Sequence, residues 1–184
     1  VRDGYYMLAK APGLRFRDQD VPGSIPVRGG ASRRRVLAEY LEAGDPGAEC
    51  SDPSLWVPTA TARKYWRWLN VVTPASASCQ CFTAGYGKTV YGGCVLASES
   101  FASSSKCVPS NVAEGRFRLA GPPEEDDEGQ LRYFSPREIA NLHGLDESFA
   151  LPSELTRRQL YFTLGNSVSV DVVAELATHL MDDA

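Results

Sequence analysis

The amino-acid sequence predicts an α/β fold of which only a part is present, and two observations support this. One stretch, GYYMLAK at residues 4–10, is apolar and aromatic, as expected of a buried strand. Several later segments instead carry the caps and the one-sided apolar pattern of helices. A single strand offers too little surface to cover so many helices. The chain is therefore expected to be the second half of a larger α/β fold.

The first part of the chain after this strand predicts a loop and two helices. Residues 11–31 are rich in glycine and proline and predict the loop. The helices are expected over residues 32–44 and 59–70. Three basic residues of the second helix are expected to point toward solvent: Arg63, Lys64 and Arg67. They are either an ordinary solvated surface or contacts to an RNA backbone.

The middle of the chain gives weaker signals. Residues 79–96 alternate short β-like pieces with glycines, which predicts strands joined by tight turns. Residues 97–115 are rich in serine and predict a connector without regular structure.

The last third of the chain is more regular, because it contains two capping boxes. Ser135 with Glu138 predicts the start of one helix, and Thr156 with Gln159 predicts the start of the next. Gly144 and Gly165 are expected to end these helices. A final amphipathic helix is indicated by apolar residues at helical spacing: Val172, Val173, Leu176, Ala177 and Leu180.

Composition excludes some classes of protein. The chain has 184 residues and a net charge of −4, which argues against a protein that coats nucleic acid through bulk charge. A local basic groove remains compatible with this charge. The sequence has no apolar run of the length that spans a membrane and no leader typical of secretion, so no membrane partner is expected.

The cysteines indicate a reduced protein rather than a disulfide framework. Their number, five, is odd, and this predicts a reduced, intracellular protein. We expect it in the cytoplasm and also in the nucleus. Cys79 and Cys81 are separated by a single residue, and the chain has only two histidines. These spacings do not supply the ligands of a zinc site, so no metal is expected.

Two stretches of the last third resemble motifs IX and X of the cytosine-5 methyltransferases. They are LRYFSPREIANLHGL at 131–145 and QLYFTLGNSVSVDVVAEL at 159–176. Either motif alone would be a weak signal, but here they occur in the family's order and at a suitable distance. The matching residues are Arg132, Arg137, Glu138, Gly165, Asn166, Ser167 and Val168.

The stretch CFTAGYG at residues 81–87 resembles the Cys-Phe-Thr signature of the branch that methylates aspartate tRNA. The resemblance implies the C-terminal part of an S-adenosylmethionine-dependent, Rossmann-like methyltransferase fold with a small α+β target-recognition domain. Residues 1–16 would then end the catalytic sheet, 17–130 would form the recognition domain, and 131–184 would return to the catalytic domain. The implied cofactor is S-adenosylmethionine, and the implied partner is tRNA, with aspartate tRNA expected.

The chemistry of this family needs residues that the chain does not contain. The family attacks cytosine with a cysteine in a Pro-Cys-Gln loop, assisted by a glutamate in Glu-Asn-Val, and neither triplet occurs here. Cys79 precedes a glutamine, but Ser78 stands where the proline would be and the pair lies in the recognition region. We therefore assign no catalytic residue and expect this chain alone to be inactive.

The resemblance assigns binding roles instead. Asn166, Ser167 and Val168 would line one side of the cofactor pocket, although Asn166 is also suited to a left-handed turn that caps the final helix. The implied substrate-binding residues are Arg2, Cys81, Phe82, Thr83, Gly85, Tyr86, Gly87 and Lys88. Among these, Tyr86 is expected to stack on a base and Lys88 to meet a phosphate. At Arg2 the family has Arg-x-Arg, whereas this chain has Gly4 at the second position.

Two other interpretations remain open. The chain is alternatively a non-catalytic RNA-binding paralogue, or part of a DNA cytosine-5 methyltransferase. The absence of a nucleophile favours a fragment or a binding module, and the Cys-Phe-Thr signature favours RNA over DNA.

Overall fold

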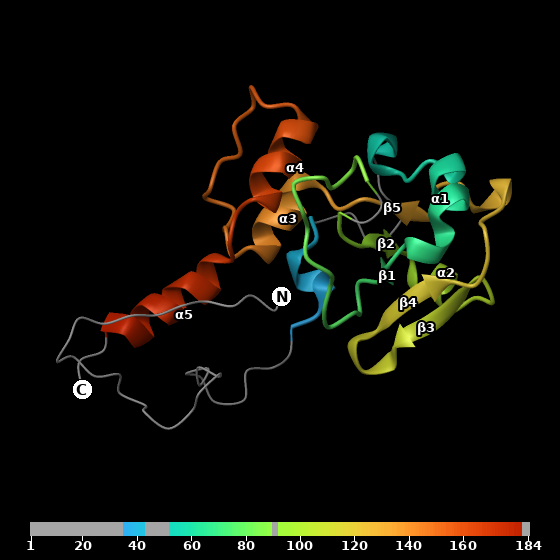
Figure 1. The fold of residues 1–184 in the computed structure, drawn as a ribbon, viewed down its shortest axis with the longest axis horizontal. Helices are drawn as coiled ribbons and strands as arrows, with labels where there is room; N and C mark the ends of the chain where they lie inside the picture. The colour runs from blue at the N-terminus through green and yellow to red at the C-terminus, as the bar shows by residue number, and fades with distance from the viewer. Residues whose placement is uncertain (1–34, 43–51, 90–91, 182–184) are drawn as a thin grey trace.

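The computed structural model describes residues 35–42, 52–89 and 92–181 (Figure 1). The strand predicted at 4–10, the loop at 11–31 and the candidate residue Arg2 lie outside the described residues. The helix predicted at 32–44 lies partly outside them, and its described portion contains a 3-10 turn at Leu37–Tyr40.

The described residues form a mixed five-stranded sheet in the order β3-β4-β1-β2-β5. Strands β1 and β2 are parallel, and the other neighbours are antiparallel. The strands are β1 Val71–Val72, β2 Val95–Ala97, β3 Cys107–Asn111, β4 Arg116–Leu119 and β5 Leu131–Arg132. Of these strands, the sequence indicated only β-structure near β2, within residues 79–96. The other four were not predicted, because strands of two to five residues are too short to show a clear alternating pattern.

Five α-helices accompany the sheet in the described residues. They are α1 Thr59–Tyr65, α2 Glu99–Ala102, α3 Pro136–Leu142, α4 Arg157–Gly165 and α5 Val170–Met181. Short 3-10 turns lie at Pro53–Leu55, Trp66–Trp68, Val112–Glu114 and Glu125–Asp127.

Both predicted capping boxes are confirmed. The Ser135 hydroxyl accepts the Glu138 N–H at 3.1 Å, and the Glu138 carboxylate accepts the Ser135 N–H at 2.8 Å. Thr156 and Gln159 exchange the corresponding bonds at 3.4 and 2.9 Å. At the start of each helix, two backbone N–H groups that lack a partner inside the helix thereby gain a hydrogen bond. These bonds fix where α3 and α4 begin.

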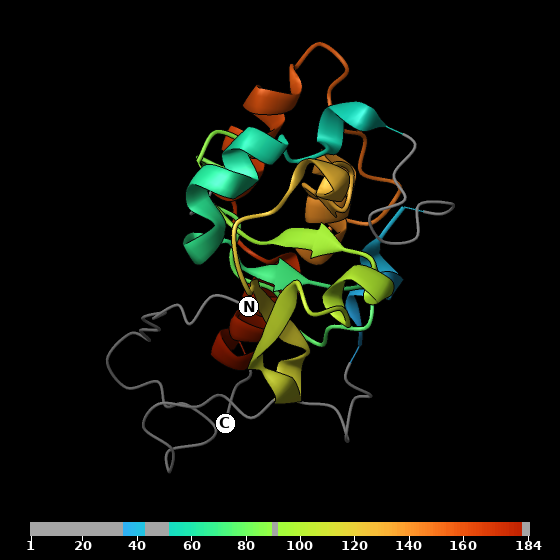
Figure 2. The ribbon, with the colours of Figure 1, turned by 90° about the vertical axis from the view of Figure 1, so that its right-hand side faces the viewer.

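Helices cover both faces of the sheet (Figure 2). On one face, Val72 of β1 packs with buried residues of α3 and α4. On the other face, Val71 packs with α1 and α2. Adjacent residues of one strand point to opposite faces, so a strand between two layers is apolar on both sides. The central strands are therefore short apolar pairs or triplets without alternation.

Two predictions for the middle of the chain need correction. Residues 81–89 form hydrogen-bonded turns without a strand. Among the described residues of the predicted 79–96 region, only Val95 and Leu96 belong to a strand, β2. The serine-rich segment 97–115 is not a plain connector, since it contains α2 and all of β3. Ser98 caps α2 by accepting the Phe101 N–H at 3.2 Å.

The last helix, α5, points away from the sheet (Figure 1). It is attached to α3 through the Val170 N–H, which donates to the His143 carbonyl at 2.7 Å. Of its predicted apolar face, Val173 is exposed, and Val172, Leu176 and Leu180 are half-buried. Among the helices that the structure describes, none has the length and apolar character needed to cross a membrane.

Candidate functional site

Residues 81–88, which the resemblance assigns to substrate recognition, are anchored by two aromatic side chains in the core. They are called here the recognition loop. Phe82 is buried, and Tyr86 is only 3% exposed. The Tyr86 ring makes edge contacts with Phe82, Tyr133 and Tyr161 at centroid distances of 4.9 to 5.4 Å. Its hydroxyl donates to the Cys94 carbonyl at 2.8 Å and accepts the Phe134 N–H at 2.9 Å.

These contacts correct the expectation that Tyr86 stacks on a base. Both faces of its ring lie in the core, and burial raises the pKa of its hydroxyl well above the ordinary value. Phe82 and Tyr86 instead hold the recognition loop in place.

The rest of the recognition loop reaches the surface. Gly87 and Lys88 are exposed, while Cys81, Thr83 and Gly85 are half-buried. The Gly87 backbone has φ +74°, a conformation that glycine adopts without strain. These five residues present backbone groups, a thiol, a hydroxyl and an ammonium to a ligand.

The residues Asn166, Ser167 and Val168, which the resemblance assigns to a cofactor pocket, directly follow α4 and are exposed. They are called here the cofactor turn. Asn166 has φ −96°, so the left-handed turn considered above does not occur. The Ser167 hydroxyl donates to the Leu164 carbonyl at 2.7 Å and holds the turn against α4. The Asn166 amide makes no hydrogen bond within the described residues and is free to bind a ligand.

The recognition loop and the cofactor turn meet at Gly165. A Cβ atom on Gly165 would lie 2.2 Å from the Thr83 carbonyl carbon and 2.3 Å from the Ala84 nitrogen. Close by, a Cβ on Gly87 would lie 2.9 Å from the Tyr161 ring. The structure thus brings together two groups of predicted site residues that are far apart in the sequence. Glycine at position 165 was visible in the sequence, but its contact with the loop was not.

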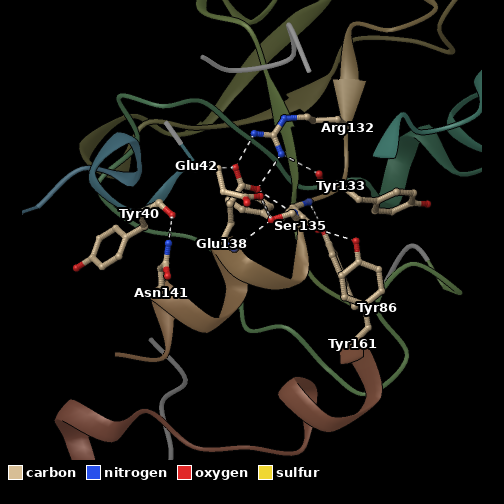
Figure 3. A network of polar contacts seen from close by, with 10 residues as sticks. Tyr40, Glu42, Tyr86, Arg132, Tyr133, Ser135, Glu138, Asn141 and Tyr161 are labelled. Carbon is tan, nitrogen blue, oxygen red and sulfur yellow. Dashed lines mark hydrogen bonds and ion pairs between the residues drawn. The ribbon is translucent and has the colours of Figure 1, made fainter. Parts of the chain in front are cut away.

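A buried ion pair between β5 and α3 lies next to this arrangement and supports it (Figure 3). Arg132 of β5 donates two hydrogen bonds of 2.8 Å to the carboxylate of Glu138 on α3, and both side chains are 0% exposed. The same carboxylate accepts the N–H groups of Ser135 at 2.8 Å and Glu42 at 3.4 Å. Arg132 also donates to the Tyr133 carbonyl at 3.0 Å. This pair therefore joins the sheet to α3.

Arg137 has a separate structural contact. Its guanidinium donates to the carbonyls of Asp146 and Phe149 at 3.1 and 2.5 Å. It thus fastens the segment after α3 to the helix.

A basic and aromatic surface lies on α1 and the turn that follows it. Arg63, Lys64 and Arg67 are exposed, as predicted. The Lys64 ammonium lies 5.0 Å from the centroid of the Tyr65 ring, and the Arg67 guanidinium lies 5.1 Å from that of Trp66. Trp68 beside them is 59% exposed, so the surface offers an aromatic ring next to cations.

The cysteines differ in their electrostatic surroundings. A hydrogen bond with the Cys94 thiol lowers the pKa of Cys79, and burial raises the pKa of Cys94 well above its ordinary value. Burial also raises the pKa of Cys107 to about 11. The described part of the chain has no group of three His, Cys, Asp or Glu residues placed to hold a metal ion.

We predict that iodoacetamide alkylates Cys79 faster than Cys94 or Cys107 in the folded protein. The thiolate is the reactive form, and only Cys79 combines a lowered pKa with partial exposure. Peptide mapping by mass spectrometry at mildly alkaline pH would measure the three rates. Equal rates for Cys79 and Cys94 would contradict this ranking.

Comparison with known proteins agrees with this geometry. The family of C-5 cytosine-specific DNA methylases matches residues 62–182. The tRNA (cytosine(38)-C(5))-methyltransferase of Mus musculus is 37% identical over 153 residues, which are 80% of this chain and 34% of the mouse protein. The human protein of the same name is 34% identical over 148 residues, 77% of this chain and 34% of its own length. The chain thus spans about a third of the length of these relatives.

The fold is also found among solved structures. The crystal structure of S. pombe Dnmt2 methyltransferase has a TM-score of 0.59 and 32% identity, covering 80% of this chain and 42% of that one. The expected partial methyltransferase fold is confirmed by this similarity and by the mixed sheet with helices on both faces. The sequence match and the fold together show that the chain belongs to the C-5 cytosine-specific DNA methylase family.

Proposed function

We propose that the protein containing this chain methylates C5 of a cytosine in tRNA, with S-adenosylmethionine as methyl donor and aspartate tRNA as substrate. The observation that carries the proposal is the direct packing of the Cys-Phe-Thr loop against Gly165, the first residue of the Gly-Asn-Ser motif. A substrate loop and a cofactor turn must be neighbours if a methyl group is to pass between their ligands. The relatives named above as tRNA (cytosine(38)-C(5))-methyltransferases support the same substrate class.

The cofactor turn is suited to one side of an S-adenosylmethionine pocket. This cofactor supplies an electrophilic methyl group, and its carboxylate, amino and ribose hydroxyl groups need hydrogen-bond partners. The Asn166 amide, which is exposed and free among the described residues, has both a donor and an acceptor. Val168 is 55% exposed and offers an apolar surface beside it. We assign Asn166, Ser167 and Val168 to cofactor binding.

The exposed part of the recognition loop is assigned to the RNA. Lys88 would meet a phosphate, while Cys81, Thr83, Gly85 and Gly87 would lie beside the extruded cytosine. Phe82 and Tyr86 serve this site indirectly, by anchoring the loop in the core. Arg2, outside the described residues, stays assigned to the substrate by resemblance.

The surface of α1 and the 3-10 turn that follows it is proposed as a second contact to the tRNA. Its three cations carry the charge needed for a phosphate backbone, and Trp68 offers a ring for stacking. This contact would explain how a chain with a net charge of −4 binds a polyanion, because the charge is local.

We also propose the domain arrangement that the family implies. Residues 1–16 end the catalytic sheet, 17–130 form the recognition domain, and 131–184 return to the catalytic domain. The direction of α5, away from the described sheet, supports the last assignment (Figure 1). Its exposed apolar residue Val173 would then pack on the catalytic domain.

The proposal predicts that the complete protein methylates tRNA and that this chain alone does not. The chain lacks the Pro-Cys-Gln and Glu-Asn-Val triplets that supply the nucleophile and the assisting glutamate in this family. Transfer of a radioactive methyl group to tRNA would be measured for both proteins. A tRNA with uridine in place of the target cytosine is the control.

Each other outcome has a defined meaning. Methylation by the isolated chain would refute the assignment of no catalytic residue. Methylation of DNA but not tRNA by the complete protein would favour the DNA enzyme. Binding of tRNA by a complete protein that transfers no methyl group would favour the RNA-binding paralogue.

A further inference from the structure

We propose that Gly165 is a positioning residue that fixes the recognition loop relative to the cofactor turn, so that the two segments keep one relative position. This inference rests on the proposed function for its catalytic consequence. The mechanical link itself rests only on contacts within the described residues.

The contact at Gly165 is between two backbones. The ideal Cβ position of Gly165 lies 2.2 Å from the Thr83 carbonyl carbon, 2.4 Å from its oxygen and 2.3 Å from the Ala84 nitrogen. Ordinary contacts begin at 3.4 Å. A methyl group at position 165 therefore requires a movement of about 1 Å, and no side-chain rotation can relieve the overlap.

The recognition loop has little freedom to move at this point. The Thr83 N–H donates to the Gly92 carbonyl at 2.7 Å, and the Thr83 carbonyl accepts the Tyr86 N–H at 2.9 Å. The backbone N–H and carbonyl of Thr83 are thus both hydrogen-bonded. Tyr86 is fixed in the core by its ring contacts and its hydroxyl. A shift at Thr83 would have to carry the neighbouring loop residues with it.

Helix α4 is also held one turn before Gly165, through Tyr161, by the same residue that holds the loop. The Tyr161 hydroxyl donates to the Phe134 carbonyl at 2.6 Å, while the Phe134 N–H donates to the Tyr86 hydroxyl at 2.9 Å (Figure 3). Phe134 is fully buried between β5 and α3. The Phe134 backbone therefore binds α4 through its carbonyl and the recognition loop through its N–H. At Gly165 the loop and α4 also contact each other directly.

The glycine allows the loop to reach α4 without a spacer. A larger residue would separate the recognition loop from the cofactor turn, which begins at the next residue. Separation by about 1 Å is enough to lower catalytic efficiency by about 100-fold when two reactants must be aligned. We therefore expect Gly165→Ala to lower kcat/KM for tRNA by about that factor.

The test compares Gly165→Ala with Gly121→Ala in the complete protein that contains this chain. Gly121 is the matched control, because a Cβ there meets nothing within 4 Å and its backbone is not in the left-handed region. The first measurement is the rate at which iodoacetamide alkylates Cys81, a half-buried residue of the loop. The buried residues Cys94 and Cys107 report in the same experiment whether the protein remains folded.

In Gly165→Ala we expect Cys81 to react several-fold faster while Cys94 and Cys107 stay slow and Gly121→Ala behaves as wild type. An unchanged Cys81 rate would overturn the inference. Should Gly165→Ala fail to fold, Tyr161→Phe serves as the second variant. This variant keeps the ring but removes the hydrogen bond to the Phe134 carbonyl. It should also raise the alkylation rate of Cys81 and leave the rates of Cys94 and Cys107 unchanged. An unchanged Cys81 rate in this variant would likewise overturn the inference.

Methyl transfer is the second measurement, and it separates this inference from the proposed function. A wild-type protein that methylates no tRNA would refute the proposed function, while the alkylation result would still decide the mechanical link. With an active wild type, we expect Gly165→Ala to lose kcat/KM for tRNA more than it loses thermal stability relative to Gly121→Ala. Loss of stability with unchanged kcat/KM would leave Gly165 a purely structural residue and overturn its positioning role.

Discussion

Replacing Arg132 with methionine is expected to lower the free energy of unfolding by about 3–5 kcal/mol. The substitution leaves the Glu138 carboxylate in the core without its counter-charge, since both side chains are fully buried. Two hydrogen bonds of 2.8 Å are lost at the same time. An uncompensated buried charge is among the most destabilising changes a protein can undergo.

Chemical denaturation of the protein that contains this chain would measure the effect. Arg137→Met is the control, because Arg137 also lies in this segment but donates only to two carbonyls at the surface. It should cost no more than about 1 kcal/mol. A double variant, Arg132→Met with Glu138→Leu, should recover part of the loss, because it removes both buried charges together. Equal costs for Arg132→Met and Arg137→Met would contradict the role of the ion pair.

The ion pair has consequences for the site because it lies beside Phe134. Arg132 and Glu138 are two positions of the motif IX resemblance, and neither reaches the surface. They join β5 to α3, and the backbone N–H and carbonyl of Phe134, which lies between them in the sequence, bind Tyr86 and Tyr161 respectively. These two buried charges of the motif therefore support the recognition loop through the Phe134 backbone.

The parts of the fold that were predictable from sequence are those set by neighbours along the chain. Ser135 with Glu138 and Thr156 with Gln159 are three residues apart, so their caps are visible as a pattern. The helix of α1 follows from helical spacing in the same way, although it ends at Tyr65 and not at residue 70, so that Arg67 lies in the 3-10 turn after it. Strands as short as Val71–Val72 carry no such pattern, because their structure depends on partners elsewhere in the chain.

The site was predictable only in part, for a similar physical reason. Resemblance selected the recognition loop and the cofactor turn, but it did not show which loop side chains face the ligand. A tyrosine between two glycines looks the same in sequence whether its ring is buried or exposed. The burial of Tyr86 depends on Phe134 and Tyr161, and the contact at Gly165 depends on Thr83. Such contacts between distant residues appear only in the folded chain.

The Tyr86→Phe substitution distinguishes a buried anchor from a base-stacking residue, and we expect it to destabilise the protein by about 1–3 kcal/mol. Phenylalanine keeps the ring but removes the hydroxyl that accepts the Phe134 N–H and donates to the Cys94 carbonyl. Both backbone groups then lose a partner in the core, where water cannot replace it. A residue that only stacked on a base would tolerate this change, because the ring face is unaltered.

Chemical denaturation of Tyr86→Phe, with Tyr65→Phe as the control, would measure the difference. Tyr65 is half-buried on α1, and its hydroxyl makes no hydrogen bond within the described residues, so its replacement should cost less than about 0.5 kcal/mol. Loss of tRNA binding by Tyr86→Phe without loss of stability would contradict the anchoring role. We expect instead that stability is lost and that tRNA binding changes only as a consequence, since an anchoring residue acts on the substrate through the position of its loop. Folded Tyr86→Phe should then bind tRNA more weakly in proportion to how far the loop, reported by Cys81, has moved.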